Sequence, residues 1–244
     1  MLKKPLSAPR PSDHTYKVLL HSSIIYRMLS LVIQAGGKSE RMGEDKALKP
    51  FLGRPLIQRV IERLDALADE IIITTNRLDA YAFLLDWHRS RPWAGRGAQE
   101  PPPLRLVSDL EPGRGALGGL YTALASATRP IAAVVACDMP FASAALLEAA
   151  AQLLVQEEAD VVIPRSAEGY EPFHAVYRCS RCVPAIRNAL QANQWKVISW
   201  FPAVRVRELT PAEVAGLDPD GRAFWNVNTS EEFAAAERLA TKLS

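Results

Sequence analysis

Short apolar runs alternate along this chain with longer segments in which apolar residues recur every three or four positions. The short runs are typical of buried strands, and the longer periodic segments are typical of helices that bury one face. Strands are predicted at Leu31–Ala35, Ile71–Thr75, Leu104–Val107, Ile131–Cys137, Val161–Pro164, Phe173–Arg178 and Val204–Leu209. Helices are predicted at Leu56–Ala68, Ala116–Thr128, from a Ser143 cap to about Glu157, at Val183–Ala192 with Pro184 near its start, and after a Thr229–Glu232 capping box. This alternation indicates βαβ units and a mainly parallel sheet.

The regular pattern is interrupted at two places. Residues 86–103 are rich in Pro, Gly and Arg, which predicts a surface loop or insertion. Residues 1–27 precede the first convincing strand, and our hypothesis is that they are a weakly ordered extension with Met28 as an alternative start. We expect residues 28–244 to form one domain, because no linker or internal repeat divides them.

The composition narrows the class of protein. The net charge of +2 and the pI near 8.5 do not indicate nucleic-acid binding, because proteins that bind nucleic acid usually carry a strongly basic stripe. The three cysteines are too few for a disulfide framework, so we expect a reducing, cytoplasmic location. Cys179 and Cys182 form a single CxxC pair, for which packing is favoured over a metal or redox role. No apolar run reaches the roughly 20 residues of a membrane span, so no membrane partner is expected.

In parallel α/β sheets ligands bind beyond the carboxyl ends of the strands, so the residues that follow each strand are the candidates. After the first strand stands AGGKSERMGEDKA, which contains a Gly-Lys-Ser. A Walker P-loop would need a glycine where Val32 stands, so the segment is not a P-loop. Its glycines can still form an anion-binding nest, and Arg41 and Lys46 can neutralise phosphate charge.

Polar side chains also follow the other strands. Asn76 and Asp109 end the second and third strands, and Asp138 directly follows the apolar run IAAVVAC. A carboxylate at the mouth of a buried strand is costly unless it is paired or binds a cation, which makes Asp138 the candidate Mg²⁺ ligand over a simple turn residue. Asn226 and Asn228 alternate on an extended segment, so both amides could face one ligand; two turn-forming asparagines are the alternative.

Five segments in order resemble the signature of the molybdenum cofactor guanylyltransferases, the MobA-like nucleotidyltransferases. They are IQAGGKSERMGEDKALKPFLGRPLIQRV, SDLEPGRGALGGLYTAL, VVACDMPF, EPFHAVYR and FWNVNTSEEF, which together cover the chain from about Leu29 to Leu239. The resemblance implies a Rossmann-like three-layer sandwich of the nucleotide-diphospho-sugar transferase type. It also implies Mg²⁺-dependent transfer of GMP from GTP to the terminal phosphate of molybdopterin, with release of pyrophosphate.

The resemblance assigns roles to residues by position. Lys46, Arg41 and Asp138 would be catalytic, with Asp138 on the metal. The nucleotide would be bound by Gln34, Ala35, Gly36, Gly37, Lys46, Asn76, Asp109 and Asp138, and the acceptor by Asn226 and Asn228. The protein is expected to act as a monomer that has transient contacts with molybdenum-cofactor enzymes or insertion proteins. An acceptor phosphate is already ionised at neutral pH, so His174 is interpreted as structural or as an acceptor contact and not as a general base.

Two departures from the family pattern bear on function. Gln34 stands where the commonest form has Leu, at the place where the base would be read, and Ala116 replaces a Pro. Asp45-Lys46-Ala47 stands where sugar and isoprenoid enzymes usually carry Pro-Lys, which favours the molybdenum branch. The alternatives are cytidylyl or other nucleotidyl transfer to a phosphorylated acceptor, and a nucleotide-binding partner protein without turnover.

Overall fold

The computed structural model describes residues 28–35, 45–93 and 100–243. Its centre is an eight-stranded sheet with the strand order β10-β7-β9-β6-β1-β4-β5, in which β8 pairs only with β7. The sheet strands are β1 (Leu29–Gln34), β4 (Glu70–Thr74), β5 (Leu104–Val107), β6 (Ile131–Ala136), β7 (Val161–Ser166), β8 (Gly169–Tyr170), β9 (His174–Arg178) and β10 (Val206–Leu209). A separate small hairpin joins β2 (Pro50–Phe51) to β3 (Arg54–Pro55).

The sheet is mainly parallel, as predicted, and its two reversed strands are β9 and the short β8, which pairs antiparallel with β7. β1 pairs in parallel with β4 and β6, β4 with β5, and β7 with β10. β9 runs antiparallel to both of its neighbours, β6 and β7. The start of β9 therefore lies at the same edge of the sheet as the carboxyl ends of the parallel strands.

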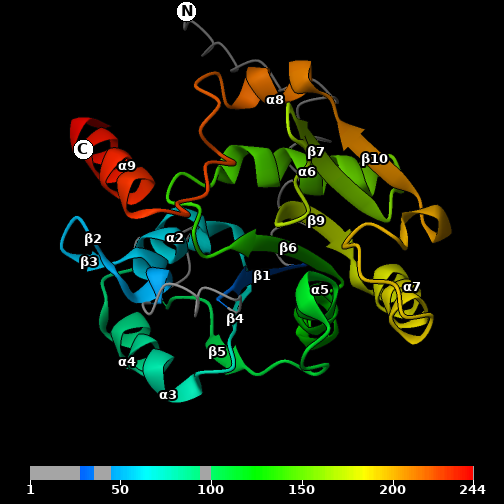
Figure 1. Cartoon of the computed structure of the whole chain (residues 1–244), viewed down its shortest axis with the longest axis horizontal. Helices are drawn as coiled ribbons and strands as arrows, with labels where there is room; N and C mark the ends of the chain where they lie inside the picture. Colours follow the sequence, from blue (N-terminus) through cyan, green and yellow to red (C-terminus); the bar gives the residue numbers. More distant parts are fainter. Residues whose placement is uncertain (1–27, 36–44, 94–99, 244) are drawn as a thin grey trace, which may run out of the picture.

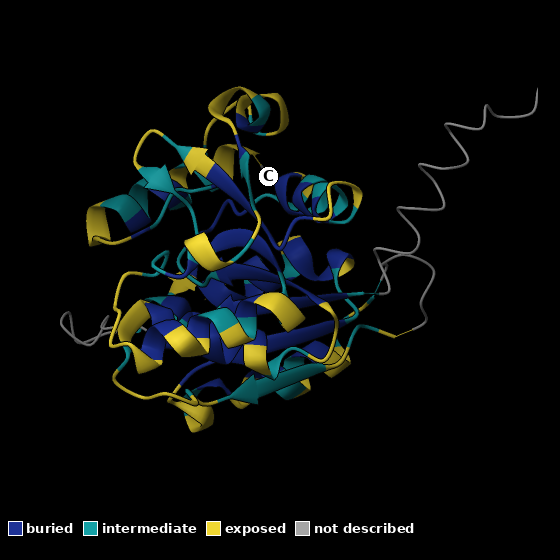
Figure 2. Cartoon of the chain, turned by 90° about the vertical axis from the view of Figure 1, so that its right-hand side faces the viewer, coloured by how far each residue is buried: buried dark blue, intermediate teal, exposed yellow. Residues whose placement is uncertain are grey.

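Helices cover both faces of the sheet and make three layers (Figure 1). They are α2 (Leu56–Leu64), α3 (Leu78–Tyr81), α4 (Phe83–Ser90), α5 (Gly115–Ser126), α6 (Ala144–Gln156), α7 (Cys179–Gln191), α8 (Pro211–Leu217) and α9 (Ser230–Leu243). Short 3₁₀ turns are η2 (Lys46–Leu48), η3 (Asp65–Leu67) and η4 (Phe201–Ala203). Figure 2 shows the buried strands between helices whose outer surfaces are exposed.

The period-two pattern of the strands divides the core into two halves. Leu31 and Ile33 of β1 pack with α2, α6 and α9 on one face of the sheet. Val32 packs on the other face with α5 and α7. Because strands buried on both faces have no polar side, their sequences are continuously apolar.

Two predicted boundaries are wrong. The segment 86–103 was expected to be loop, but α4 extends to Ser90 because Leu84 and His88, four residues apart, are both buried. His88 Nε2 lies 2.7 Å from the carbonyl of Pro102, which holds the helix to the chain that leads into β5. Residues 91–93 and 100–103 are irregular, as expected, and 94–99 lie outside the described residues.

Helix α7 begins at Cys179, four residues before the predicted start, so Pro184 lies inside the helix. The Cys179 N–H donates to the Pro130 carbonyl (3.0 Å), which anchors the first turn to the strand beside it. Proline leaves the carbonyl four residues earlier without its helical partner. That residue is the exposed Ser180, where water can take the place of the missing N–H.

The capping residues predicted for α6 and α9 are confirmed. Ser143 caps α6 by accepting the Leu146 N–H at 3.3 Å. Thr229 and Glu232 form the expected capping box, since each side chain accepts the other residue's backbone N–H. The β2–β3 hairpin, α3, β8 and α8 were not predicted. The extension 1–27 lies outside the described residues.

Candidate active site

Four strand ends lie at one edge of the sheet and bring Gln34, Asn76, Asp109 and Asp138 to that edge. The N–H of Ala35, after β1, donates to Thr74 of β4 at 2.9 Å. The N–H of Cys137, after β6, donates to Gln34 at 3.0 Å, and the N–H of Thr75 donates to Val107 of β5 at 2.9 Å. The residues that follow β1, β4, β5 and β6 are therefore neighbours across the sheet, although they come from positions more than 100 residues apart.

Asn76 and Asp109 form a reciprocal pair beyond β4 and β5. Asn76 Nδ2 donates to Asp109 Oδ2 at 2.9 Å, and the Asp109 N–H donates to Asn76 Oδ1 at 3.0 Å. Asn76 is exposed and Asp109 is partly exposed. This pairing fixes the asparagine amide in one orientation before any ligand arrives.

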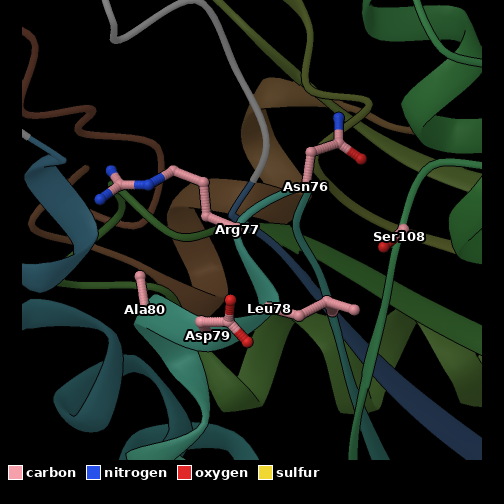
Figure 3. A pocket seen from close by; sticks show the side chains of 6 residues that line it. All are labelled: Asn76, Arg77, Leu78, Asp79, Ala80 and Ser108. Carbon is pink, nitrogen blue, oxygen red and sulfur yellow. The ribbon is translucent and has the colours of Figure 1, made fainter.

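A cleft of about 530 Å³ opens beside this pair. It is lined by Asn76, Arg77, Leu78, Asp79, Ala80 and Ser108. Figure 3 shows Arg77 on one side of the cleft and Ser108 on the other, with Asn76 between them. Its lining is mostly polar side chains and backbone, which suits a hydrophilic ligand better than an apolar one.

Asp138 lies at the end of β6, where burial raises the pKa of its carboxyl group and the positive charge of Lys46 lowers it. Cys137 beside it also interacts with Asp45 and Lys46, and burial raises the pKa of its thiol. Lys46 is therefore near enough to Asp138 for the two charges to interact. A cation at this carboxylate would offset the cost of its burial.

The Asn226–Asn228 segment is tied to the same aspartate. The N–H of Val227, which is fully buried between the two asparagines, donates to the Asp138 carbonyl at 3.0 Å. Asn226 Nδ2 donates to the Phe224 carbonyl (3.2 Å), which leaves its Oδ1 outside that bond. The Asn228 N–H donates to Glu232 (2.6 Å), so the α9 capping box also holds this segment. These contacts are those of a structured turn, and the ligand-facing role of the two asparagines stays a prediction.

Lys46 owes its position to Asp45, a residue that the sequence analysis did not select. Asp45 caps η2, the short turn that Lys46 begins, by accepting the Ala47 N–H through Oδ1 at 3.2 Å. Its other oxygen, Oδ2, accepts the Tyr81 hydroxyl at 2.8 Å and an Arg77 N–H at 3.3 Å. Helix α3 and its preceding residue thus hold the Asp45-Lys46 turn. The signal available in the sequence was an Asx-type cap directly before the lysine.

Gln34 ends β1 with its side chain directed at α5. A Cβ added at Gly119 would lie 3.3 Å from Gln34 Nε2, so the absence of a side chain on Gly119 makes room for this amide. Nε2 is buried and has no hydrogen-bond partner among the described residues. Of the other predicted residues, Gly36, Gly37 and Arg41 lie outside the described residues.

The donor set at Asp138 was tested against Mg²⁺, the metal that the resemblance implies. Within residues 28–35, 45–93 and 100–243, no three His, Cys, Asp or Glu side chains converge on one point. Mg²⁺ in nucleotide sites takes one or two carboxylates together with water and substrate phosphates, and does not need such a cage. One partly buried carboxylate, on a loop whose Asp138 carbonyl accepts the N–H of Val227 between the two asparagines, fits that requirement.

The CxxC pair forms no disulfide. Cys179 and Cys182 are both free, and burial raises the pKa of the Cys179 thiol to about 12. Cys182 is buried and donates to the Asp160 carbonyl at 3.3 Å. A thiol with a raised pKa is a poor nucleophile and metal ligand. The pair packs α7 against the sheet, in keeping with the interpretation favoured from the sequence.

Residues 31–205 match the sequence model of the MobA-like NTP transferase domain. The chain belongs to this family. Molybdenum cofactor guanylyltransferase from Desulfosudis oleivorans is 32% identical over 207 residues, which cover 84% of this chain and 93% of that protein. The probable molybdenum cofactor guanylyltransferase of Pelotomaculum thermopropionicum is 35% identical over 86% of this chain and 92% of its own. The family resemblance found in the sequence is confirmed.

Solved structures show the same fold in MobA-like and other nucleotidyltransferases. Molybdopterin-guanine dinucleotide biosynthesis protein A from Archaeoglobus fulgidus has a TM-score of 0.68 at 23% identity, over 87% of this chain and 99% of its own. The 4-diphosphocytidyl-2C-methyl-D-erythritol synthase of Anaerococcus prevotii has a TM-score of 0.60 at 14% identity, over 88% and 99%. The predicted fold class is confirmed. No helix in the described part of the chain is both long and apolar enough to cross a bilayer.

Proposed function

We propose that this protein transfers GMP from GTP to the terminal phosphate of molybdopterin, with Mg²⁺ as its cofactor. Membership of the MobA-like family supports nucleotidyl transfer in molybdenum cofactor biosynthesis. The observations that support the site are the effect of the Lys46 charge on Asp138 and the bond from Val227 N–H, in the Asn226–Asn228 segment, to the Asp138 carbonyl. The protein is proposed to work in the cytoplasm, as a monomer formed by residues 28–244 as one domain.

The chemistry needs alignment and charge stabilisation but no protein nucleophile. A terminal phosphate oxygen of the acceptor forms a bond to the α-phosphorus of GTP, and the bond from that phosphorus to the bridging oxygen of pyrophosphate breaks. Mg²⁺, when bound, would neutralise the developing charge on the transferring group. Asp138 and the asparagine amides would hold it, and Lys46 would bind the triphosphate.

The base would lie at the end of β1, near the cleft beside Asn76. Backbone groups of residues 34–37 would hold the guanine, and the paired amide and carboxylate of Asn76 and Asp109 would contact the nucleoside. Holding both reactants in one orientation supplies much of the acceleration in reactions of this kind. Arg41 would add a positive charge at the phosphates.

A nucleotide panel tests this function directly. Pyrophosphate release is measured with purified protein, Mg²⁺, molybdopterin and each of GTP, CTP, ATP and UTP. The expected result is release with GTP that requires both molybdopterin and Mg²⁺. Release with CTP instead of GTP would contradict only the guanine assignment. If none of the four nucleotides gave pyrophosphate, the proposed enzyme activity would be refuted and a nucleotide-binding protein without turnover would remain.

The role of Lys46 has a matched control in the same short segment. Lys46→Ala is expected to weaken GTP binding by at least about tenfold, since it removes a charge-assisted contact with phosphate. The Nζ atom of Lys49, three residues on, lies 4.9 Å from the ring centroid of Phe233 on α9, so Lys49→Ala should leave GTP affinity unchanged. Calorimetry of both variants decides. Equal affinity in wild type and Lys46→Ala would remove Lys46 from the site.

A further inference from the structure

His174 is a fully buried imidazole at the first position of β9, on the edge of the sheet where the site lies. Its Nε2 accepts the backbone N–H of Ser143 at 2.9 Å. A nitrogen that accepts carries no proton, so in the neutral ring the proton is on Nδ1. The ring also packs edge-to-face on Phe224, with centroids 5.3 Å apart and an interplanar angle of 84°.

These two contacts reach the two segments that carry the proposed metal-binding groups. Ser143 ends the 138–143 loop, which begins with Asp138, and Phe224 lies two residues before Asn226. The segments also touch each other directly, since Val227 N–H donates to the Asp138 carbonyl at 3.0 Å. The imidazole therefore lies where it can set the distance between them.

The need for an acceptor at this position follows from the cap of α6. In a capping box, a Glu or Gln at the third helical position returns to the N–H of the capping residue. Glu213 and Glu232 do this for α8 and α9. In α6 the third helical residue is Leu146, whose side chain has no acceptor. His174 from strand β9 accepts the Ser143 N–H in its place.

We propose that His174 is a positioning residue, which fixes the Asp138 loop relative to the Asn226–Asn228 segment by completing the cap of α6. The inference rests on the proposed function, because it assumes that these two segments hold the metal and phosphates. Loss of the His174 contact should therefore affect the part of GTP binding that depends on Mg²⁺. Gln34, Asn76 and Asp109, the described side chains proposed for the base and the nucleoside, lie at the ends of β1, β4 and β5, and none of them has a hydrogen bond or ring contact with His174.

Three variants separate positioning from mere stability. His174→Leu keeps an apolar side chain of similar size but has no acceptor, and His174→Gln offers an amide oxygen that can accept the Ser143 N–H. Val176→Ala is the matched control, since Val176 is fully buried on the same strand and on the same face as His174. GTP affinity is measured by calorimetry in EDTA and in Mg²⁺, together with kcat and the melting temperature.

In His174→Leu, affinity in EDTA should equal that of wild type. The gain in affinity on adding Mg²⁺ and the kcat should both fall by roughly 10- to 100-fold, as for lost groups that orient metal ligands. His174→Gln should recover most of both. Val176→Ala should lose melting temperature without either change. Full Mg²⁺-dependent affinity and kcat in His174→Leu, or equal losses in Val176→Ala, would overturn the inference.

The tautomer provides a readout that does not depend on turnover. ¹⁵N NMR of labelled histidine, assigned with the His174→Gln variant, should show the proton on Nδ1 of His174. A proton on Nε2 would exclude the hydrogen bond from the Ser143 N–H. It would overturn this inference and leave the proposed function unaffected. If wild-type protein neither bound GTP nor released pyrophosphate, the proposed function would fail instead, and the functional part of this inference with it.

Discussion

Tyr81→Phe tests whether the network around Asp45 places Lys46. The Tyr81 side chain is fully buried, and its hydroxyl donates to Asp45 Oδ2 at 2.8 Å. Phenylalanine keeps the ring and its packing, so the variant removes one hydrogen bond and little else. Among the described residues, the other side-chain partner of that oxygen is Arg77, whose side chain is 56% exposed and whose ion pair is screened by water.

A hydrogen bond to a charged group contributes about 1.5–3 kcal/mol, so the variant should lose about 2 kcal/mol of unfolding free energy. If Asp45 orients the η2 turn, the loss should extend to function as a three- to tenfold weaker GTP affinity, roughly 0.7–1.4 kcal/mol. Urea unfolding measures the first quantity and calorimetry with GTP measures the second.

Tyr121→Phe is the matched control, because the Tyr121 hydroxyl accepts from Arg187 at 2.8 Å and links α5 to α7, away from Lys46. It should lower stability and leave GTP affinity unchanged. A Tyr81→Phe protein that is destabilised but binds GTP as tightly as wild type would refute the claim that this network positions the lysine.

Three further predictions address individual side chains. Asp138→Asn should abolish pyrophosphate release while far-UV circular dichroism stays that of wild type; near-normal turnover would remove Asp138 from the metal site. Burial lowers the pKa of His174 to about 4 from its usual 6.5. The neutral imidazole therefore costs the folded state nothing above pH 6.5, and the free energy of unfolding should fall by about 3 kcal/mol as the pH drops towards 4. Urea unfolding at several pH values should show that component in wild type and not in His174→Leu. Gln34→Leu replaces a buried amide that has no partner among the described residues, so it should raise the free energy of unfolding by about 1 kcal/mol and raise the melting temperature with it. A melting temperature below that of wild type would show that the amide is paired.

The fold could be predicted from local patterns because the central strands β1, β4 and β6 are buried on both faces. Such strands must be apolar throughout, and the runs at 31–35 and 131–137 differ from the observed β1 and β6 by two residues or fewer at each end. The start of α7 could not be predicted, since Pro184 indicated a first turn there. The contact that sets the true start, from the Cys179 N–H to Pro130, joins residues 49 positions apart.

The same distinction holds for the site. Asn76, Asp109 and Asp138 could be selected because each follows a strand, and position after a strand is visible in one dimension. Asp45, Tyr81 and His174 could not be assigned their roles, because the partners of Tyr81 and His174 lie 36 and 31 residues away. A tyrosine hydroxyl or an imidazole has the same local appearance in sequence whether it faces solvent or a carboxylate.

The sequence by itself determined the main strands and most of the helices that cover them, which strand ends are polar, and which family the chain resembles. These properties depend on side-chain chemistry at neighbouring or regularly spaced positions. Only the tertiary structure decided that Lys46 is held through Asp45, that Asn76 and Asp109 bond to each other, and that His174 completes the cap of α6. Those relations depend on which distant segments the sheet order brings together, and pairing between strands is not encoded in any single segment.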